Sequence, residues 1–186
     1  MLRQLFAVLL LPVAVLPAAT PSTDPDARAR ELVKQMRGDE RTTLLHGAMA
    51  LTIGEIHAPP GAIPGAGQVP GIPRLGIPAL AETDASLGVA YALGQRHDGA
   101  TALPSGLALA SAWDPALMRE SGAMIAREAH SKGFNVLLAG GANLVRDPRG
   151  GRSFEYLGED PWLTGTLAGA AVTGIQSEHV ISTVKR

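Results

Sequence analysis

Apolar and polar positions follow a helical period through residues 114–133, where the sequence reads DPALMRESGAMIAREAHSKG. Asp114 is a favourable N-cap, Pro115 suits the first helical position, and Gly133 supplies a stop at the C-terminal end. The pattern therefore predicts a helix with defined ends. One lateral stripe of this helix is mainly small or apolar and consists of Leu117, Ser121, Met124, Ile125 and Glu128.

The same signals return further along the chain. Asp160 and Pro161 open a second predicted helix, which continues to about residue 176 and carries an apolar face. Short apolar or β-branched runs predict four strands, at residues 76–80, 101–104, 135–139 and 180–184. Strands that alternate with helices in this way are typical of an α/β fold with a parallel sheet.

The number of strands limits the architecture. A closed (β/α)8 barrel needs eight strands and about 250 residues, whereas this chain has 186 residues and four predicted strands. We therefore expect the N-terminal half of a TIM-type barrel, incomplete in this chain. In such a barrel, loops that follow strands lie on the face where active sites are built.

The first part of the chain contains four segments. Residues 1–19 combine an early basic residue, an apolar run and small residues, which predicts a signal peptide and a secreted or periplasmic protein. An uncleaved membrane anchor is the alternative. Residues 20–27 are expected to be a linker, and residues 27–47 are expected to form a helix with Leu32, Val33 and Met36 on one stripe. Residues 58–78 are rich in Gly and Pro, which favours an ordered loop or arm.

Composition excludes several classes of function. The formal net charge is −1, so the composition gives no sign of the basic surface that binds nucleic acid. The chain has no cysteine, so disulfides and thiolate chemistry are absent, and its five histidines show no metal-ligand spacing. The stretch GAGQVPG only approaches a dinucleotide fingerprint and lacks the strand-to-helix context, so no cofactor is expected. Aromatic residues make up only 4%, which predicts a core of small and aliphatic side chains. Trp113 and Trp162 each flank an Asp-Pro helix start, where packing against the helix entrance is expected in preference to stacking against a sugar.

Charge gathers in one loop, RDPRGGRSFEYLGED, at residues 146–160. Its arginines could bind a ligand, since guanidinium groups suit carboxylates and paired hydroxyls. The loop could equally neutralise itself through its four carboxylates, at Asp147, Glu155, Glu159 and Asp160. Glu82 and Asp84 would lie roughly 6.5 Å apart on one side of a strand, a spacing open to an acid–base pair and to loop capping. Lys185 could contact a ligand or simply face solvent.

Several segments together, in order and spacing, resemble a known family. They are PGIPRLGIPALAETDASLGVA, DGATALPSGLALASAWDPAL and GFNVLLAGGANLVRDPRGGRSFEYLGEDPWLTGTLAGAAVTGIQSEHVISTVK. The resemblance is to glycoside hydrolase family 3, with secreted bacterial β-glucosidases as the nearest likeness, and it covers residues 28–185. It implies a glycosidase that hydrolyses O-glycosyl bonds with retention, acting on a β-glucoside or oligosaccharide. By motif match it also implies that Asp84, Arg152 and Lys185 bind the sugar.

The resemblance also has departures. Ser153 stands where the family usually has asparagine, and Arg186 stands where it has histidine. The nucleophile and the acid/base of the family lie on later segments, so we expect no catalytic residue in this chain, which would then be truncated and inactive alone. The alternatives are a non-catalytic sugar-binding half barrel and a subunit completed in trans. The open edge of a half barrel is further expected to favour self-association.

Overall fold

The computed structural model describes residues 23–90 and 92–185, which fall into two compact units divided between Met36 and Arg37. The predicted signal peptide, residues 1–19, and Arg186 lie outside the described residues. In the first unit, α1 (Pro25–Gln35) begins inside the segment expected to be a linker. The Asp24 carboxylate caps α1 by accepting hydrogen bonds from the backbone amides of Asp26 and Ala27, at 3.1 and 3.3 Å.

The single helix expected over residues 27–47 is wrong. The chain is extended at Met36 and Arg37, and a separate short helix, α2 (Gly38–Thr43), follows in the second unit. Glu40 explains this start, because its carboxylate accepts a hydrogen bond from the backbone amide of Arg37 at 2.9 Å. The same carboxylate is paired with Arg74 at 2.6 Å. A long-range ion pair thus helps to fix a helix boundary that periodicity could not reveal.

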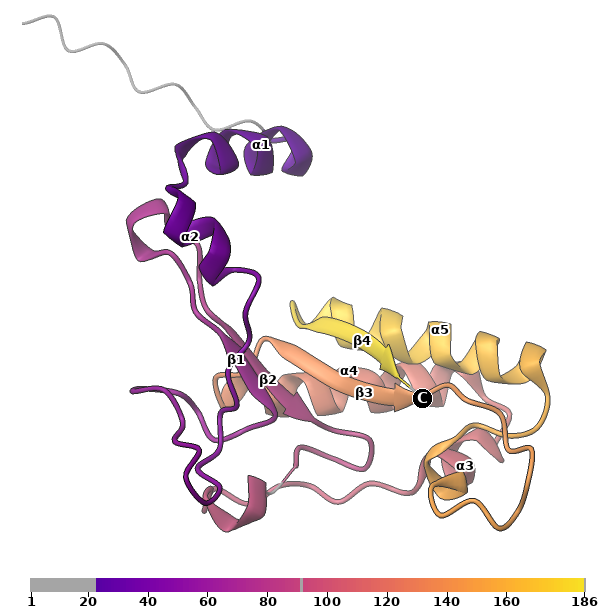
Figure 1. The fold of residues 1–186 in the computed structure, drawn as a ribbon. Helices are drawn as coiled ribbons and strands as arrows, with labels where there is room; N and C mark the ends of the chain where they lie inside the picture. The colour runs from indigo at the N-terminus through magenta and orange to yellow at the C-terminus, as the bar shows by residue number, and fades with distance from the viewer. Residues whose placement is uncertain (1–22, 91, 186) are drawn as a thin grey trace, which may run out of the picture. The chain divides into compact units, whose positions relative to one another are not determined.

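The second unit contains a mixed four-stranded sheet with the order β1-β2-β3-β4 (Figure 1). β1 (Gly67–Val69) pairs antiparallel with β2 (Leu80–Asp84). β2, β3 (Val136–Gly141) and β4 (Ile181–Lys185) are mutually parallel, so their carboxyl ends lie at one edge of the sheet. The predicted α/β class is confirmed.

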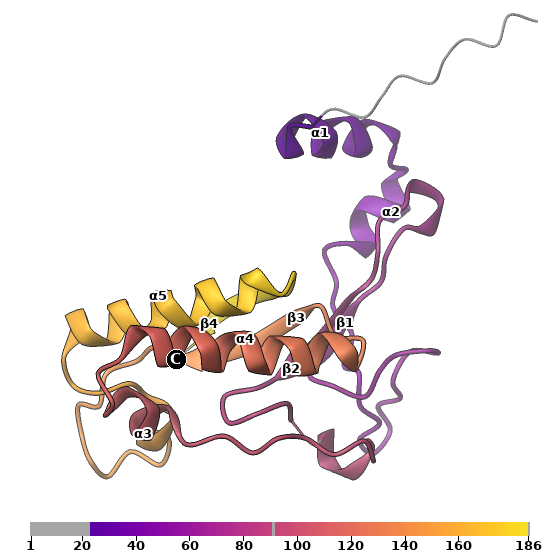
Figure 2. The same ribbon diagram turned by 180° about the vertical axis from the view of Figure 1, so that it is seen from behind.

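Two long helices, α4 (Pro115–Ser131) and α5 (Pro161–Ser177), lie side by side on one face of the sheet (Figures 1 and 2). Both begin with the predicted Asp-Pro caps. Asp114 accepts hydrogen bonds from the amides at the start of α4, and Asp160 accepts one from the Leu163 amide at 2.7 Å. A short α3 (Gly106–Ala110) precedes α4 and was not predicted. Three 3₁₀ turns complete the described elements, at Pro73–Leu75, Ala92–Gly94 and Ser153–Glu155.

Glycine allows α4 and α5 to approach closely. A Cβ atom on Gly122 of α4 would overlap the backbone at Ala171 of α5, and one on Gly174 of α5 would overlap the backbone at Arg119 of α4. Beneath the helices lies a core rich in alanine, with Phe134 and Leu137 as its largest fully buried members. The core is therefore built mainly from small and aliphatic side chains, as composition predicts.

Two predicted strands differ from the structure. The strand expected at 76–80 begins only at Leu80 and ends at Asp84. Residues 101–104 form no strand, and the Leu103 amide joins them to the preceding loop by a hydrogen bond to the Leu87 carbonyl at 2.9 Å. The Gly/Pro-rich segment 58–78 contains β1, which the sequence did not indicate. β1 depends on pairing with β2, which is a tertiary effect that outweighs its weak local strand propensity.

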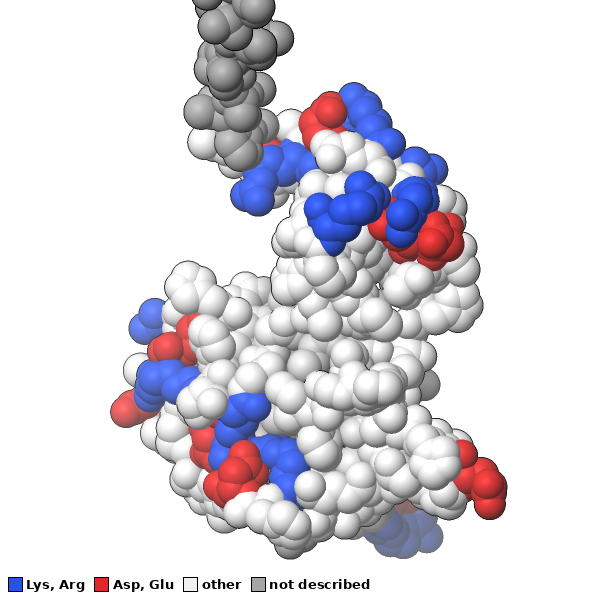
Figure 3. Space-filling model, turned by 90° about the vertical axis from the view of Figure 1, so that its left-hand side faces the viewer, with Lys and Arg blue, Asp and Glu red and all other residues white. Residues whose placement is uncertain are grey.

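Surface charge is mixed. On the face drawn in Figure 3, basic and acidic side chains lie beside one another instead of separating into areas of one sign. No helix within residues 23–90 and 92–185 has the length and apolar character needed to cross a membrane.

Candidate functional site

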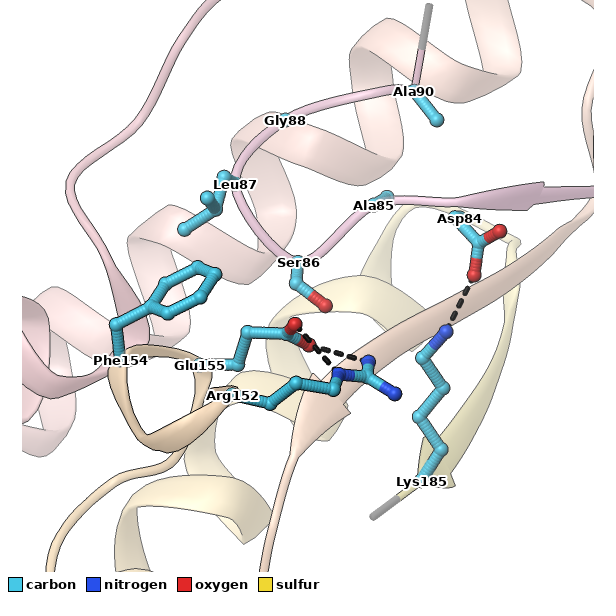
Figure 4. A pocket seen from close by; sticks show the side chains of 10 residues that line it. All are labelled: Asp84, Ala85, Ser86, Leu87, Gly88, Ala90, Arg152, Phe154, Glu155 and Lys185. Carbon is cyan, nitrogen blue, oxygen red and sulfur yellow. Dashed lines mark hydrogen bonds and ion pairs between the residues drawn. The ribbon is translucent and has the colours of Figure 1, made fainter. Parts of the chain in front are cut away.

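A pocket of about 480 Å³ opens where the parallel strands end. β2 contributes Asp84 at its last position, β4 contributes Lys185 at its last position, and the charged loop contributes Arg152 (Figure 4). These are the three residues that the sequence marked as sugar ligands, and the fold brings all of them to one pocket. The other lining residues are Ala85, Ser86, Leu87, Gly88, Ala90, Phe154 and Glu155.

Asp84 and Lys185 form an ion pair across the mouth of this pocket, from Lys185 Nζ to Asp84 Oδ1. The two residues sit on β2 and β4, which are separated by β3. Both side chains remain partly exposed, at 52% for Asp84 and 31% for Lys185. The pair is therefore accessible to a ligand and is not part of the buried core.

Arg152 and Glu155 form a second, bidentate pair. Arg152 donates from Nε and Nη2 to the two oxygens of Glu155, at 2.8 and 2.7 Å. The hydrogen bond from Arg152 holds the pKa of Glu155 below its usual range, and the charges of Arg152 and Lys185 act in the same direction. The pocket thus carries two cations and two carboxylates, with Glu155 in its charged form at neutral pH.

The loop after β2 shapes the apolar side of the pocket. Gly88 adopts a φ of 117°, which side chains rarely tolerate, and a Cβ there would overlap the carbonyl of Thr101. This close approach turns the chain so that Ser86 and Leu87 line the pocket opposite Phe154 (Figure 4). Ser86, Phe154 and Glu155 were not selected as ligands from the sequence. The nearest signal was their position, directly after β2 and inside the charged loop.

The charged loop is both self-neutralising and pocket-forming. Arg149 pairs with Asp147 at 2.6 Å, and this contact lowers the pKa of Asp147. Arg146 donates to the side chain of Asn143 at 2.9 Å, and Asp160 caps α5. Two of the four expected carboxylates, Asp147 and Glu155, therefore neutralise loop arginines, while Arg152 also faces the pocket. At the position of the family's asparagine, the hydroxyl of Ser153 donates a long hydrogen bond to the Asp147 carbonyl, at 3.4 Å.

Other candidates lie elsewhere. Glu82 does not line the pocket that contains Asp84, and its carboxylate lies beside Gly67 of β1. Within the described part of the chain no group of three or more His, Asp or Glu side chains is placed to hold a metal. Trp113 and Trp162 are 74% and 83% exposed, so the expected packing at the helix entrances is wrong. Trp113 follows α3 with a left-handed backbone, at a φ of 53°, which the sequence pattern gave no reason to expect.

Comparison with known proteins gives a consistent result. Residues 66–186 match the family model of the glycosyl hydrolase family 3 N-terminal domain, and this match covers more than half of the chain. Among curated proteins, β-glucosidase BoGH3A of Bacteroides ovatus is 34% identical over 179 residues, covering 91% of this chain and 22% of that protein. Probable β-glucosidase H of Aspergillus flavus is 42% identical over 114 residues, covering 61% of this chain and 14% of that protein.

Solved structures agree with these relatives. β-Glucosidase 3B of Thermotoga neapolitana in complex with α-D-glucose superposes with a TM-score of 0.76 and 32% identity, covering 86% of this chain and 23% of that one. The β-glucosidase DesR of Streptomyces venezuelae in complex with D-glucose has a TM-score of 0.72 and 34% identity. The match covers 86% of this chain and 19% of that one. The chain thus spans between 14% and 23% of the lengths of these four relatives. Sequence, domain model and fold all lead to the same assignment: the chain belongs to glycosyl hydrolase family 3.

Proposed function

We propose that this chain forms the glucose-binding part of a β-glucosidase, an enzyme that hydrolyses O-glycosyl bonds. One observation carries the proposal. Asp84, Arg152 and Lys185 come from three separate segments and line one pocket at the carboxyl ends of the parallel strands. The same end of the sheet holds the ligands in barrel enzymes. Relatives that share the fold are β-glucosidases with glucose bound in their structures.

The pocket chemistry suits a polyhydroxylated ligand. Asp84 accepts hydrogen bonds, while Lys185 and Arg152 donate them, so adjacent hydroxyls of one pyranose ring can each find a partner. A hydroxyl group inserted between Asp84 and Lys185 would keep both charges hydrogen-bonded. Leu87 and Phe154 offer apolar surface to the carbon face of the ring. We infer that the non-reducing-end glucose of a β-glucoside binds here.

These residues bind but do not catalyse. A retaining glycosidase needs one carboxylate as nucleophile and another that is protonated and serves as acid. Glu155 has a lowered pKa because Arg152 donates to it, so it is charged and cannot protonate a leaving group near neutral pH. Asp84 is engaged by Lys185. The proposal therefore assigns no catalytic role to any residue of this chain and leaves bond cleavage to the remainder of a family 3 enzyme.

The architecture proposed around this site is half of a TIM-type barrel, with β4 as one open edge. β4 pairs only with β3 among the described strands, and its side chains Ile181 and Val184 are exposed. Such an edge can accept another strand, either from a second copy or from a chain that completes the barrel in trans. A sugar-binding half barrel without hydrolytic activity is the alternative function that the paired carboxylates favour.

We further propose that the protein is exported to the periplasm or secreted. The basis is the composition of residues 1–19, which combine Arg3 with an apolar run and a small-residue end. N-terminal sequencing of the exported product tests this. A start near residue 20 is expected, and retention of Met1 in a cytoplasmic product would contradict it.

The function is tested with purified chain in two assays. Calorimetric titration with glucose is expected to show binding that Arg152→Met abolishes, whereas an aryl β-glucoside is expected to remain intact. Arg149→Met is the matched control, because Arg149 is another loop arginine paired with a carboxylate but does not line the pocket. Absence of glucose binding by a folded chain would refute the proposal. Hydrolysis of the aryl β-glucoside by the purified chain would contradict it as well.

A further inference from the structure

A second pocket, of about 500 Å³, lies at the N-terminal ends of α4 and α5. Both helices begin at the same end of their layer (Figure 2). Trp113 precedes the cap of α4 and Trp162 lies in the first turn of α5, and both indoles line the pocket. None of its lining residues belongs to the pocket of Asp84, Arg152 and Lys185.

The side chains of Trp113 and Trp162 are unusually exposed to solvent. Tryptophan is highly buried on average because of its large apolar surface, yet Trp113 and Trp162 are 74% and 83% exposed. Within the described residues neither indole N–H donates a hydrogen bond to the protein. Both rings are therefore available to a ligand.

Trp113 is also held in a conformation that disfavours its own side chain. Its φ of 53° lies in the left-handed region, and its amide donates to the Ala110 carbonyl at 3.0 Å just after α3. Glycine is the usual residue where a helix ends in this way, because it carries no Cβ. A large aromatic residue placed under such strain is a common mark of a functional position.

The remaining walls define the ligand class. Pro115, Leu163 and Leu167 supply apolar surface, while Asp160 and Thr166 supply polar groups. Asp160 uses Oδ1 for the Leu163 amide, and its Oδ2 accepts no hydrogen bond from any other described residue. No Lys or Arg lines the pocket, so anionic ligands and nucleic acid are disfavoured. A neutral ligand with an apolar face and hydroxyl edges satisfies both kinds of surface.

We propose that Trp113 and Trp162 form a stacking platform for the pyranose rings of a β-linked gluco-oligosaccharide. Each indole presents an apolar face to the carbon face of a sugar ring. The indole N–H groups donate hydrogen bonds to sugar hydroxyls, and Asp160 accepts hydrogen bonds from them. The choice of glucose units rests on the proposed function, whereas the platform itself rests on the indoles. A pocket of this volume holds more than one sugar ring. It is larger than an aromatic cage that encloses a small ammonium group.

The chain offers a direct reporter, because Trp113 and Trp162 are its only tryptophans. Titration of the full chain with cellopentaose is expected to give a saturable change in tryptophan fluorescence. Trp162→Ala should weaken binding about tenfold or more, and Trp162→Tyr, which keeps a ring, should weaken it less. Trp113→Gly should weaken binding while raising the melting temperature, because glycine relieves the left-handed strain. A loss of binding with Trp113→Gly thus cannot be ascribed to unfolding.

Two controls separate this proposal from the proposed function. Leu45→Ala removes another highly exposed apolar side chain and should leave the fluorescence response unchanged. Arg149→Met should also preserve the response, since Arg149 lines neither pocket. If glucose fails to bind in the calorimetric test while cellopentaose still changes the fluorescence, the proposed function fails and the platform stands.

Three results would overturn the platform. The first is an unchanged emission spectrum up to about 10 mM cellopentaose, a range that reveals even millimolar affinity. The second is a response to choline but none to the oligosaccharide, which would identify a cation cage. The third is a spectrum that depends on protein concentration without sugar, which would identify the indoles as a contact between copies of the chain.

Discussion

The ammonium group of Lys185 lies against the carboxylate of Asp84 at the ends of two strands that are not neighbours in the sheet. Their positions in the chain differ by 101 residues. In the absence of a ligand, each charge satisfies the other. On the proposed function, a sugar that enters the pocket inserts its hydroxyls into this existing ion pair, and its affinity depends on both members.

The first prediction concerns this pair. Lys185→Met is expected to weaken glucose binding about tenfold or more, because Asp84 loses its fixed partner and the sugar loses a donor. The free energy of unfolding should fall by less than about 1 kcal/mol, since partly exposed ion pairs contribute little to stability. Titration calorimetry and urea denaturation measure the two effects. Equal affinity for glucose in Lys185→Met and the unmodified chain would show that the lysine is not a ligand.

The second prediction concerns acid stability. The hydrogen bond from Arg74, together with the one from the Arg37 amide, lowers the pKa of Glu40 to about 2 from the ordinary value of 4.5. The carboxylate of Glu40 is thus harder to protonate in the folded state than in the unfolded state. The stabilisation by Glu40 is fully present above pH 4.5 and is lost as the pH falls towards 2.

Glu40→Gln is therefore expected to be less stable than the unmodified chain at pH 6, with a smaller difference at pH 3. Urea midpoints at the two pH values measure this. Glu120→Gln is the control, because Glu120 is an exposed carboxylate of α4 that joins no ion pair among the described residues. A stability difference for Glu40→Gln that stays constant between the two pH values would contradict the assignment.

The third prediction concerns the contact between α4 and α5. Gly174→Ala is expected to lower stability by about 1–3 kcal/mol, as overpacked sites do, because the new Cβ would overlap the backbone of α4. Gly169→Ala on the same helix has open space around it and should raise stability by about 0.5–1 kcal/mol. Thermal unfolding of the two variants measures the contrast. Equal melting temperatures would mean that the helices can separate without cost.

The fourth prediction concerns the exposed side of β4. Ile181 is 50% exposed on this edge strand, and Ile181→Lys is expected to reduce self-association because lysine discourages strand addition. Sedimentation velocity at several protein concentrations measures the extent of self-association. Val33→Lys makes the same kind of change on α1 and should have no effect. If the unmodified chain self-associates and Ile181→Lys sediments in the same way, the contact between copies lies on another surface.

The elements with strong local signals were the ones that the sequence predicted well. Asp114 and Asp160 cap their helices through their own side chains, so three or four adjacent residues decide where each helix begins. The pocket residues Asp84, Arg152 and Lys185 were found by motif, and the fold then brought them together. Asp84 and Lys185 lie at the ends of parallel strands, and Arg152 lies in the loop that follows β3.

The features that were missed depend on distant partners. The break between α1 and α2 involves Glu40, which is held by Arg74 from a later loop. β1 exists because β2 lies beside it. Residues 101–104 form no strand, and their partners are also distant: the Leu103 amide donates to the Leu87 carbonyl and the Thr101 amide to the Glu128 carboxylate. Trp113 is a different case, because its left-handed backbone is encoded by no period or propensity and its amide bonds to the nearby Ala110 carbonyl. For the helix boundary and for β1, a contact remote in sequence overrides the local preference.

The separation of Asp84 from Lys185 along the chain has a consequence for synthesis. A ribosome adds about 5–20 residues per second, so some 5–20 seconds pass between the translation of Asp84 and that of its partner 101 positions later. During this interval β2 has neither its pocket nor the full sheet beside it. During those seconds the nascent polypeptide carries an unfinished edge at β2, and a chaperone that covers β2 would act before the pocket of Asp84 and Lys185 exists.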